Sequence, residues 1–442
     1  MEKVHFIGIG GIGVSALAKY YLKKRFRVSG SDLVPSEITE SLRKQGARIF
    51  TGKHSGKNLI KDASLVIYSP AIQPDNPELK EAKRRKIKIQ SYPEALGQLT
   101  KEYFTIAVSG THGKSTTTAM LGLIFIKAGF DPTIIIGTKL KELGNSNCRV
   151  GKSQYLIIEA DEHFASFLNY WPRIVILTSL EEDHLDYYKN LKNIISAFRK
   201  YLGHLDKDGI LIANKDDRNV FNLSRIIKNT VYYSLKQKEA KRLKSILKVP
   251  GEHNISNALA ALSVARTLKI PDKTSFQALS SYTHAWRRFE IHRIKIRGKR
   301  VTLISDYGHH PTEVRVTLKA AREKYPEKKI LCVFQPHQYQ RTYYLFKDFV
   351  RVLKKAPIDK IIITDIYDVA GREEKDIKKK VNAEKLARAV NGNKTIYVPK
   401  KEIPDYLEKN LKGGEVLIVM GAGDIYNLTL SLTGIGKRKK IY

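Results

Sequence analysis

Short apolar strands alternate with helical segments along the whole chain, and this alternation constrains the fold most. In the first hundred residues the strands are VHFIGIG, RVSGSD, LVIYSPAI and IKIQSY. A second series runs from FTIAVSG to GILIANKDD, and a third contains VTLISDYG, KILCVFQP, KIIITDIY and EVLIVMGAG. Such alternation is typical of parallel sheets with helices on both faces. The 442 residues predict three α/β domains, spanning residues 1–99, 100–284 and 285–442.

The chain is strongly basic, with 79 Lys and Arg against 44 Asp and Glu and a net charge of +35. Such a balance favours acidic partners, but the basic residues are scattered, as in KRLKSILK and VRVLKK, which is typical of solvated helix faces. We therefore expect no nucleic acid and no membrane as partner.

The two cysteines, Cys148 and Cys332, lie far apart and predict neither a disulfide framework nor a zinc site. No stretch reaches 18 apolar residues and the N-terminus runs straight into a strand. These features predict a reduced, soluble, cytoplasmic protein, and the basic tail GKRKKIY is predicted to be disordered.

A shortened phosphate loop, SGTHGKSTTT, occupies residues 109–118. In the usual G-x-x-x-x-G-K-[ST] pattern a glycine would stand at Val108, but here it stands at Gly110. The strand FTIAV precedes the loop and a predicted helix follows it to Gly129. An exposed Lys114 can then reach the phosphates of a nucleotide, and the Ser115 hydroxyl can bind Mg²⁺. From the loop alone, a glycine turn before a core helix stays open as an alternative.

A second glycine turn, GIGGIG at Gly8–Gly13, follows the first strand and opens a helix, which is the context of a dinucleotide-binding turn. Asp32 ends the next strand and can bind the ribose of NAD or of another nucleotide. No domain for hydride transfer follows, whereas a second phosphate loop does, and this disfavours a dehydrogenase.

Further polar clusters follow later strands: EADE (Glu159–Glu162), EEDHLDYY (Glu181–Tyr188), HAWRRFE, SDYGHHPTEV and FQPHQYQRT. Because ligands of α/β sheets bind at the carboxyl ends of the strands, the acidic clusters predict a metal site beside Ser115. The segment GEHNISNALAA starts a helix with Asn254 and Asn257 on one face, three positions apart. The His, Arg and Tyr residues of the last third indicate an anionic ligand.

Taken together, HFIGIGGIGVSALA, SGTHGKSTTT, EADE, EEDHLDYY, HNISNALAA, WRRFE, DYGHHPTEV and MGAGD resemble the Mur ligases, the ATP-dependent amide-forming enzymes of peptidoglycan precursor synthesis. The resemblance covers essentially the whole chain, in family order. It implies a Rossmann-like N-terminal domain, a P-loop ATPase-like central domain and a Rossmann-like C-terminal domain. It also implies ligation of L-alanine to UDP-N-acetylmuramate through an acyl phosphate, with ATP and Mg²⁺, by a monomer or weak homodimer.

The site residues implied by the resemblance fall into four groups. The ATP site comprises Gly110, Thr111, His112, Gly113, Lys114, Ser115, Thr116, His253, Asn254, Asn257, Arg288 and Asp306. The catalytic residues are Lys114, Glu159 and His184, and the Mg²⁺ ligands are Ser115, Glu159 and His184. The UDP-sugar site comprises Gly10, Gly11, Ile12, Gly13, Asp32, His54 and Ser69. The amino-acid site comprises Tyr307, His309, His337 and Arg341.

The sequence departs from the family pattern at a few of these positions. Ser115 replaces a threonine and keeps the hydroxyl, and Ser305 replaces an aspartate. Gln338 stands where the alanine-adding enzymes commonly carry arginine, so we expect Arg341 to bind the substrate carboxylate and the pocket to accept L-alanine, glycine or L-serine. Two alternatives stay open: a recycling ligase that adds a murein tripeptide to the same nucleotide sugar, and a non-catalytic nucleotide- and nucleic-acid-binding protein.

Overall fold

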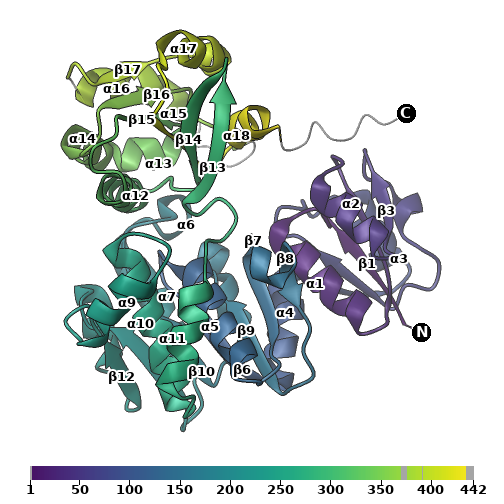
Figure 1. Ribbon diagram of the computed structural model, residues 1–442. Coiled ribbons are helices and arrows are strands. Elements are labelled where there is room, and N and C mark those ends of the chain that lie inside the picture. Colours follow the sequence, from purple (N-terminus) through teal and green to yellow (C-terminus); the bar gives the residue numbers. More distant parts are fainter. Residues whose placement is uncertain (1, 370–375, 391, 435–442) are drawn as a thin grey trace. The chain divides into compact units, whose positions relative to one another are not determined.

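The computed structural model describes residues 2–369, 376–390 and 392–434, and the basic tail GKRKKIY lies outside the described residues. By its internal contacts the chain divides into two compact units. The first unit consists of Met1–Leu180, Ile194–Ile246 and Ser256–Tyr282, and the second of Glu181–Asn193, Leu247–Ile255 and Thr283–Tyr442. The first unit contains two sheets and the second contains one (Figure 1).

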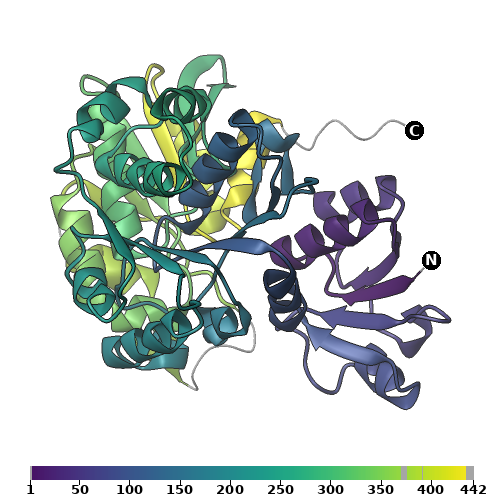
Figure 2. The same ribbon diagram turned by 90° about the horizontal axis from the view of Figure 1, so that it is seen from below.

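The N-terminal sheet has strand order β3-β2-β1-β4-β5, and every neighbouring pair is parallel. Its strands are β1 (Lys3–Ile7), β2 (Arg27–Asp32), β3 (Arg48–Thr51), β4 (Leu65–Tyr68) and β5 (Lys88–Ser91). The helices of this region are α1 (Ile12–Lys23), α2 (Glu37–Lys44), η1 (Gly56–Asn58), α3 (Pro77–Arg84) and α4 (Tyr92–Glu102). Helix α1 packs on β1 and β2 and helix α4 on β4 and β5 (Figure 2).

The second sheet of the first unit has the order β12-β11-β10-β6-β9-β7-β8. Its strands are β6 (Phe104–Ser109), β7 (Thr133–Leu140), β8 (Ser146–Arg149), β9 (Tyr155–Glu159), β10 (Ile174–Leu177), β11 (Ile210–Asn214) and β12 (Thr230–Tyr233). The helices between Lys114 and Ser281 are α5 (Lys114–Lys127), η2 (Lys141–Leu143), η3 (His163–Asn169), α6 (Leu185–Tyr188), α7 (Leu191–Leu202), α8 (Arg218–Ser224), α9 (Glu239–Ile246), α10 (Glu252–Thr267) and α11 (Asp272–Ser281). The edge strand β8 runs antiparallel to β7, a hairpin that the strand pattern did not predict.

The sheet of the second unit has the order β13-β14-β18-β15-β16-β17, with only β13 antiparallel to its neighbour among the described strands. Its strands are β13 (Glu290–Ile296), β14 (Lys299–Asp306), β15 (Ile330–Phe334), β16 (Lys360–Ile363), β17 (Thr395–Tyr397) and β18 (Val416–Met420). Its helices are α12 (Pro311–Lys324), α13 (Tyr339–Tyr344), α14 (Phe346–Lys355), α15 (Ile377–Lys380), α16 (Ala383–Val390), η4 (Lys400–Glu402), α17 (Ile403–Asn410) and α18 (Tyr426–Thr433).

Strands β15 and β18 show why a predicted parallel sheet needs cover on both faces. Side chains alternate along a strand, so Cys332 and Phe334 enter one hydrophobic core while Val333 enters the other. Ile418 and Val419 of β18 divide in the same way. The predicted three-part α/β fold with parallel sheets is thereby confirmed, and the domain boundaries at residues 99 and 284 remain a proposal.

The helix after the phosphate loop is shorter than predicted. It ends at Lys127 rather than at Gly129, because Gly129 has a positive φ of 79° that leaves the helical conformation. Within residues 2–369, 376–390 and 392–434, none of the helices combines the length and the apolar character needed to cross a bilayer.

Candidate active site

The phosphate loop joins β6 to α5, and two glycines allow its tight path. Gly110 and Gly113 have φ of 123° and 84°, a region that L-residues rarely adopt. A Cβ atom at Gly110 would lie 2.3 Å from Thr178 Oγ1, and one at Gly113 would lie 2.4 Å from Asn257 Oδ1. Thr111 N donates to Ser179 O at 2.9 Å and thereby holds the loop against the segment that follows β10. The loop is therefore close-packed, and only glycine fits at these two positions.

Lys114 is folded back over this loop instead of extending into solvent. Its ammonium donates to Gly110 O at 2.8 Å and to Glu162 Oε2 at 2.7 Å. The side chain is 15% exposed and that of Glu162 is 3% exposed, so the expectation of an exposed loop lysine was wrong. Burial alone would lower the pKa of Lys114, but the neighbouring Glu162 carboxylate outweighs burial and the pKa is raised. The ammonium is therefore held charged beside the N-terminus of α5.

Ser115 and Glu159 come together as the sequence predicted. Ser115 Oγ donates to Glu159 Oε2 at 3.0 Å, and Gly137 N of β7 donates to Glu159 Oε1 at 2.7 Å. A hydroxyl and a carboxylate oxygen at this spacing suit the oxygen preference of Mg²⁺. The first turn of α5 carries no acidic residue, so its N-terminus favours an anion. These groups fit a Mg²⁺-bound nucleotide phosphate.

The N-terminal glycine turn is tied to the end of β2. Gly10 N donates to Asp32 Oδ2 at 2.8 Å, and a Cβ atom at Gly10 would lie at the same distance from that oxygen. A Cβ atom at Gly13 would lie 2.9 Å from the Tyr92 ring, and one at Gly8 would lie 3.0 Å from Ser69 Cβ. The turn, Asp32 and Ser69 therefore lie together at one edge of the sheet, with Gly11 capping α1 and Ile12 as its first residue.

His54, predicted in the UDP-sugar site, belongs to a buried polar cluster centred on Glu78. Glu78 Oε1 accepts from His54 Nδ1 at 2.8 Å and Oε2 accepts from His5 Nε2 at 2.8 Å and from Ser31 Oγ at 2.7 Å. Burial alone would raise the pKa of Glu78, but the hydrogen bonds from His5, Ser31, Asn58 and His54 prevail and lower it to about 2. Glu78 is therefore a carboxylate at neutral pH.

The polar start of α10 divides between the two units. Asn257 in the first unit lies beside Gly113 of the phosphate loop. His253 and Asn254 belong to the second unit, where Asn254 Nδ2 donates to Pro250 O at 2.6 Å. Burial lowers the pKa of His253 to about 4, with further lowering by Arg315 and Arg288. His253 is thus a neutral imidazole at pH 7.

In the second unit, Asp306 binds backbone N–H groups of the neighbouring loops. Its carboxylate accepts from Phe289 N and from Gly308 N, each at 2.8 Å, and its ribose-binding role stays a prediction. The guanidinium carbon of Arg288 lies 5.0 Å from the centroid of the Tyr307 ring. Arg288 Nη1 forms an ion pair with Glu313 Oε1 at 3.6 Å.

The four residues predicted to bind the amino acid form a continuous cluster in the second unit. The rings of Tyr307 and His309 lie 5.3 Å apart, those of His309 and His337 lie 5.5 Å apart, and Arg341 Nη1 lies 3.1 Å from His337 Nδ1. Burial lowers the pKa of His309 to about 4, against the attraction of Glu313. Burial, the neighbouring His309 and Arg341 lower the pKa of His337 to about 2. Both rings are therefore neutral at pH 7.

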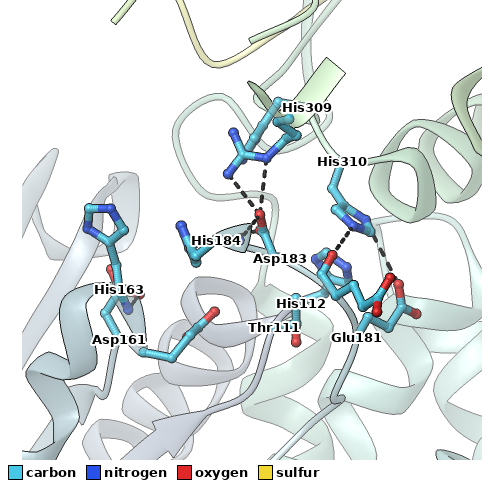
Figure 3. A network of polar contacts seen from close by, with 12 residues as sticks. Thr111, His112, Asp161, His163, Glu181, Asp183, His184, His309 and His310 are labelled. Atoms are coloured by element: carbon cyan, nitrogen blue, oxygen red, sulfur yellow. Dashed lines mark hydrogen bonds and ion pairs between the residues drawn. The ribbon is translucent and has the colours of Figure 1, made fainter. Parts of the chain in front are cut away.

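Arg341 carries a partner that the sequence did not reveal. Asp183, drawn with its hydrogen bonds in Figure 3, accepts from Arg341 Nε at 3.1 Å and from Nη2 at 2.8 Å. Burial alone would raise the pKa of Asp183, but the Arg341 guanidinium holds it well below its usual range. His184, the predicted metal ligand, belongs to the same unit and donates from its backbone N to Asp183 Oδ1 at 2.7 Å.

Protein-family models match most of the chain. The model described as "Mur ligase family, catalytic domain" matches residues 3–104, "Mur ligase middle domain" matches residues 108–265, and "Mur ligase, glutamate ligase domain" matches residues 287–423. The chain belongs to the Mur ligase family. This confirms the family resemblance of the motifs, and the loop SGTHGKS lies within the match to the middle domain.

Named Mur ligases resemble the chain over nearly its full length. The UDP-N-acetylmuramate--L-alanine ligase of Acetivibrio thermocellus is 42% identical over 455 residues, covering 97% of this chain and 94% of the relative. The same-named enzyme of Clostridium botulinum is 41% identical over 451 residues, with 97% and 96% covered. The crystal structure of UDP-N-acetylmuramate-alanine ligase from Thermotoga maritima superposes with a TM-score of 0.80 at 28% identity, covering 100% of both chains. A murein peptide ligase from Psychrobacter arcticus shares the fold, with a TM-score of 0.70 at 22% identity over 98% of this chain and 99% of that one.

The sequence did not predict the roles of several residues near these sites. Glu162 belongs to the quoted EADE motif, but its spacing gives no sign that it pairs with Lys114. Arg287 was passed over beside Arg288, although it is buried and its guanidinium carbon lies 4.8 Å from the Tyr307 ring centroid. Glu78 follows Asn76, whose side chain caps α3, so it has the sequence signature of an ordinary first-turn acid.

Proposed function

We propose that this Mur ligase joins L-alanine to UDP-N-acetylmuramate with conversion of ATP to ADP and phosphate. The observation that carries the proposal is the geometry at the N-terminus of α5. There the charged Lys114 and Ser115 follow the glycine loop directly, and Ser115 is hydrogen-bonded to Glu159 at the end of β9. The choice of sugar and amino acid is supported by relatives with that name at 41 and 42% identity over 97% of the chain.

The reaction makes an activated acid before it makes the amide. A carboxylate oxygen of the sugar's lactyl group attacks the γ-phosphorus of ATP, the bond to the β-phosphate oxygen breaks, and ADP leaves. The amine of alanine then attacks the acyl carbon, a tetrahedral intermediate forms, and phosphate leaves with the C–O bond electrons while the nitrogen loses a proton. Lys114 would stabilise negative charge on the transferring phosphoryl group. Ser115 and Glu159 would hold Mg²⁺, which supplies charge neutralisation at the phosphates when bound.

The amino-acid cluster has the chemistry to hold a small zwitterion. His309 Nδ1 lies 3.1 Å from Tyr307 O and donates to it, so the Nε2 atom of this neutral ring can accept a hydrogen bond from an ammonium or amine. His337 Nδ1 accepts from Arg341, so its Nε2 atom donates, and Arg341 can donate to a carboxylate. Because Arg341 already binds Asp183, a substrate carboxylate would have to share or displace that contact. We place the reaction in the cytoplasm, where ATP and nucleotide sugars are made, and propose a monomer or weak homodimer.

Phosphate release from purified protein tests the proposal directly. The assay contains UDP-N-acetylmuramate, ATP and Mg²⁺ with L-alanine, glycine, L-serine or a murein tripeptide supplied separately and then side by side. We expect release that depends on the nucleotide sugar and is fastest with L-alanine. A clear preference for the tripeptide would instead identify a recycling ligase.

Two controls address the remaining alternatives. NADH should not compete with UDP-N-acetylmuramate for the N-terminal glycine turn, and tighter binding of NADH would reverse that assignment. Salt-sensitive DNA or RNA binding without substrate-dependent ADP release would favour a non-catalytic protein.

A further inference from the structure

The buried Glu78 carboxylate determines which nitrogen of His54 carries the proton. An ionised carboxylate accepts hydrogen bonds and cannot donate them. Its contacts at 2.8 Å with His54 Nδ1 and with His5 Nε2 therefore require a proton on each of these nitrogens. The remaining nitrogen of His5, Nδ1, lies 2.8 Å from Ser29 Oγ and accepts from that hydroxyl. The N–H groups of both imidazoles then have an acceptor.

The same reasoning leaves His54 Nε2 as an acceptor. With the proton on Nδ1, the other nitrogen of a neutral imidazole carries a lone pair. His54 Nε2 has no hydrogen-bond partner within the part of the chain that the structure describes. The His54 side chain is 11% exposed, whereas that of Glu78 is fully buried. The cluster thus presents one acceptor outward and keeps its charge inside.

This acceptor lies at the sheet edge where the base of a bound nucleotide is expected. The glycine turn follows β1, Asp32 ends β2, and His54 follows β3, which are neighbouring strands. In such sheets the diphosphate lies at the glycine turn and the ribose at the acid after β2, so the base extends toward β3. Ser31 Oγ, next to Asp32, lies 3.2 Å from His54 Nδ1 and places the ring beside the ribose position.

We propose that Glu78 is a positioning residue for base selection: by holding the proton on His54 Nδ1, it makes Nε2 an acceptor that selects a base with a ring N–H donor. Uracil has such a donor at N3, whereas the N3 atom of cytosine is an acceptor and would face the Nε2 lone pair. The inference rests on the proposed use of a UDP-sugar and extends it from the sugar to the base.

Nucleotide binding to the full chain tests the inference without catalysis. The affinities of UDP, CDP and UDP methylated at uracil N3 are measured by calorimetry. We expect the wild type to prefer UDP to CDP and to N3-methyl-UDP by about tenfold or more, because either analogue leaves a buried polar group without its partner. Equal affinity for UDP and its N3-methyl analogue would overturn the inference.

Variants at Glu78 separate a positioning role from simple packing. Glu78→Met removes both acceptors and frees the His54 tautomer, so the UDP-to-CDP ratio should fall toward one. Glu78→Gln should keep the ratio, because its amide oxygen can still accept from His54 Nδ1. Its amide nitrogen would then donate to His5 Nε2, and His5 can carry its proton on Nδ1 instead and donate to Ser29 Oγ. His54→Gln should also lose the preference, and it decides the outcome if Glu78→Met fails to fold.

A matched control lies on the other side of the cluster. Ser29→Ala removes a buried hydroxyl from His5 and leaves the contact between Glu78 and His54 intact, so the ratio should stay at its wild-type value. An unchanged ratio in both Glu78→Met and His54→Gln would disprove the inference while leaving the ligase assignment standing. Failure of the proposed function itself has a different signature, namely a wild-type protein that binds no UDP compound.

Discussion

At the scale of single residues, the ion pair between Lys114 and Glu162 links catalysis to stability. We predict that Lys114→Ala lowers phosphate release by at least about a hundredfold, the usual loss when one preorganised charge is removed from a transition state. It should also cost about 2 kcal/mol of stability, because Glu162 stays buried without its cation. Steady-state kinetics and thermal unfolding measure the two effects.

The double variant Lys114→Met with Glu162→Gln provides the control. It carries no unpaired charge, so it should recover stability and remain inactive. Wild-type turnover in either variant would contradict the assignment of the phosphate loop.

The amino-acid cluster gives a second prediction, at Gln338 and Arg341. Gln338→Arg should lower KM for L-alanine severalfold with little change in kcat, because a carboxylate remote from the reacting amine is held about equally in ground and transition states. Arg341→Ala should raise KM far more and should also destabilise the protein, since the buried Asp183 loses its cationic partner. An unchanged KM in Arg341→Ala would show that the amino acid binds elsewhere.

The low pKa of Glu78 leads us to predict that local stability depends on pH. Its pKa is about 2 in the folded protein against an ordinary value of 4.5, a difference on the order of 3 kcal/mol. A depressed carboxyl pKa stabilises the fold above pH 4.5, and this contribution falls as the pH drops from 4.5 toward 2. Hydrogen exchange of β1 and β2 amides should therefore show a destabilisation by Glu78→Gln at pH 7 that shrinks at pH 3. A pH-independent difference would contradict the prediction.

At the scale of elements, the turn into α5 depends on a glycine for two separate reasons. Gly113→Ala imposes a strained positive φ and drives a methyl group against Asn257. Gly129→Ala, just beyond the same helix, imposes a similar φ but meets no atom within 4 Å. We expect each substitution to cost about 1 kcal/mol of strain, with only Gly113→Ala also weakening ATP binding by tenfold or more. Calorimetry with ATP and thermal unfolding of both variants test this, and equal ATP affinity in the two would refute it.

At the scale of the whole molecule, a buried amide contributes to the contact between the two sheets of the first unit. Asn147 of β8 donates to Ile12 O at 2.6 Å and to Ser15 Oγ at 2.9 Å, and accepts from Lys19 Nζ at 2.7 Å. These groups belong to α1, the helix that follows the N-terminal glycine turn (Figure 1). The β7–β8 hairpin therefore holds the helix expected to face the UDP diphosphate.

We predict that Asn147→Leu destabilises the first unit by roughly 3 kcal/mol, because the buried Lys19 ammonium loses its shortest hydrogen bond and the Ile12 carbonyl loses one of its donors. The weaker 3.4 Å contact of Lys19 with Ser146 supplies a control, since Ser146→Ala should change stability by less than about 1 kcal/mol. Unfolding in urea compares the two variants. Equal stability of both would show that Asn147 does not hold the sheets together.

The sequence by itself determined the fold class and the positions of the ligand-binding loops. Alternating strands and helices, the glycine turns after β1 and β6, and the hydroxyl of Ser115 are local patterns, because a turn and the helix it opens are set by adjacent residues. The pairing of Ser115 with Glu159 was also predictable, since parallel strands bring their carboxyl ends to one edge.

Only the tertiary structure decided which charges those residues face. Arg341 is hydrogen-bonded to Asp183, which lies 158 positions away in the sequence, and Glu78 is hydrogen-bonded to His5, which lies 73 positions away. Lys114 is likewise neutralised by Glu162 rather than exposed. The antiparallel strands β8 and β13 at the sheet edges also depended on packing. Local patterns carry no information on such contacts, because burial and long-range pairing arise only when distant segments pack together and exclude water.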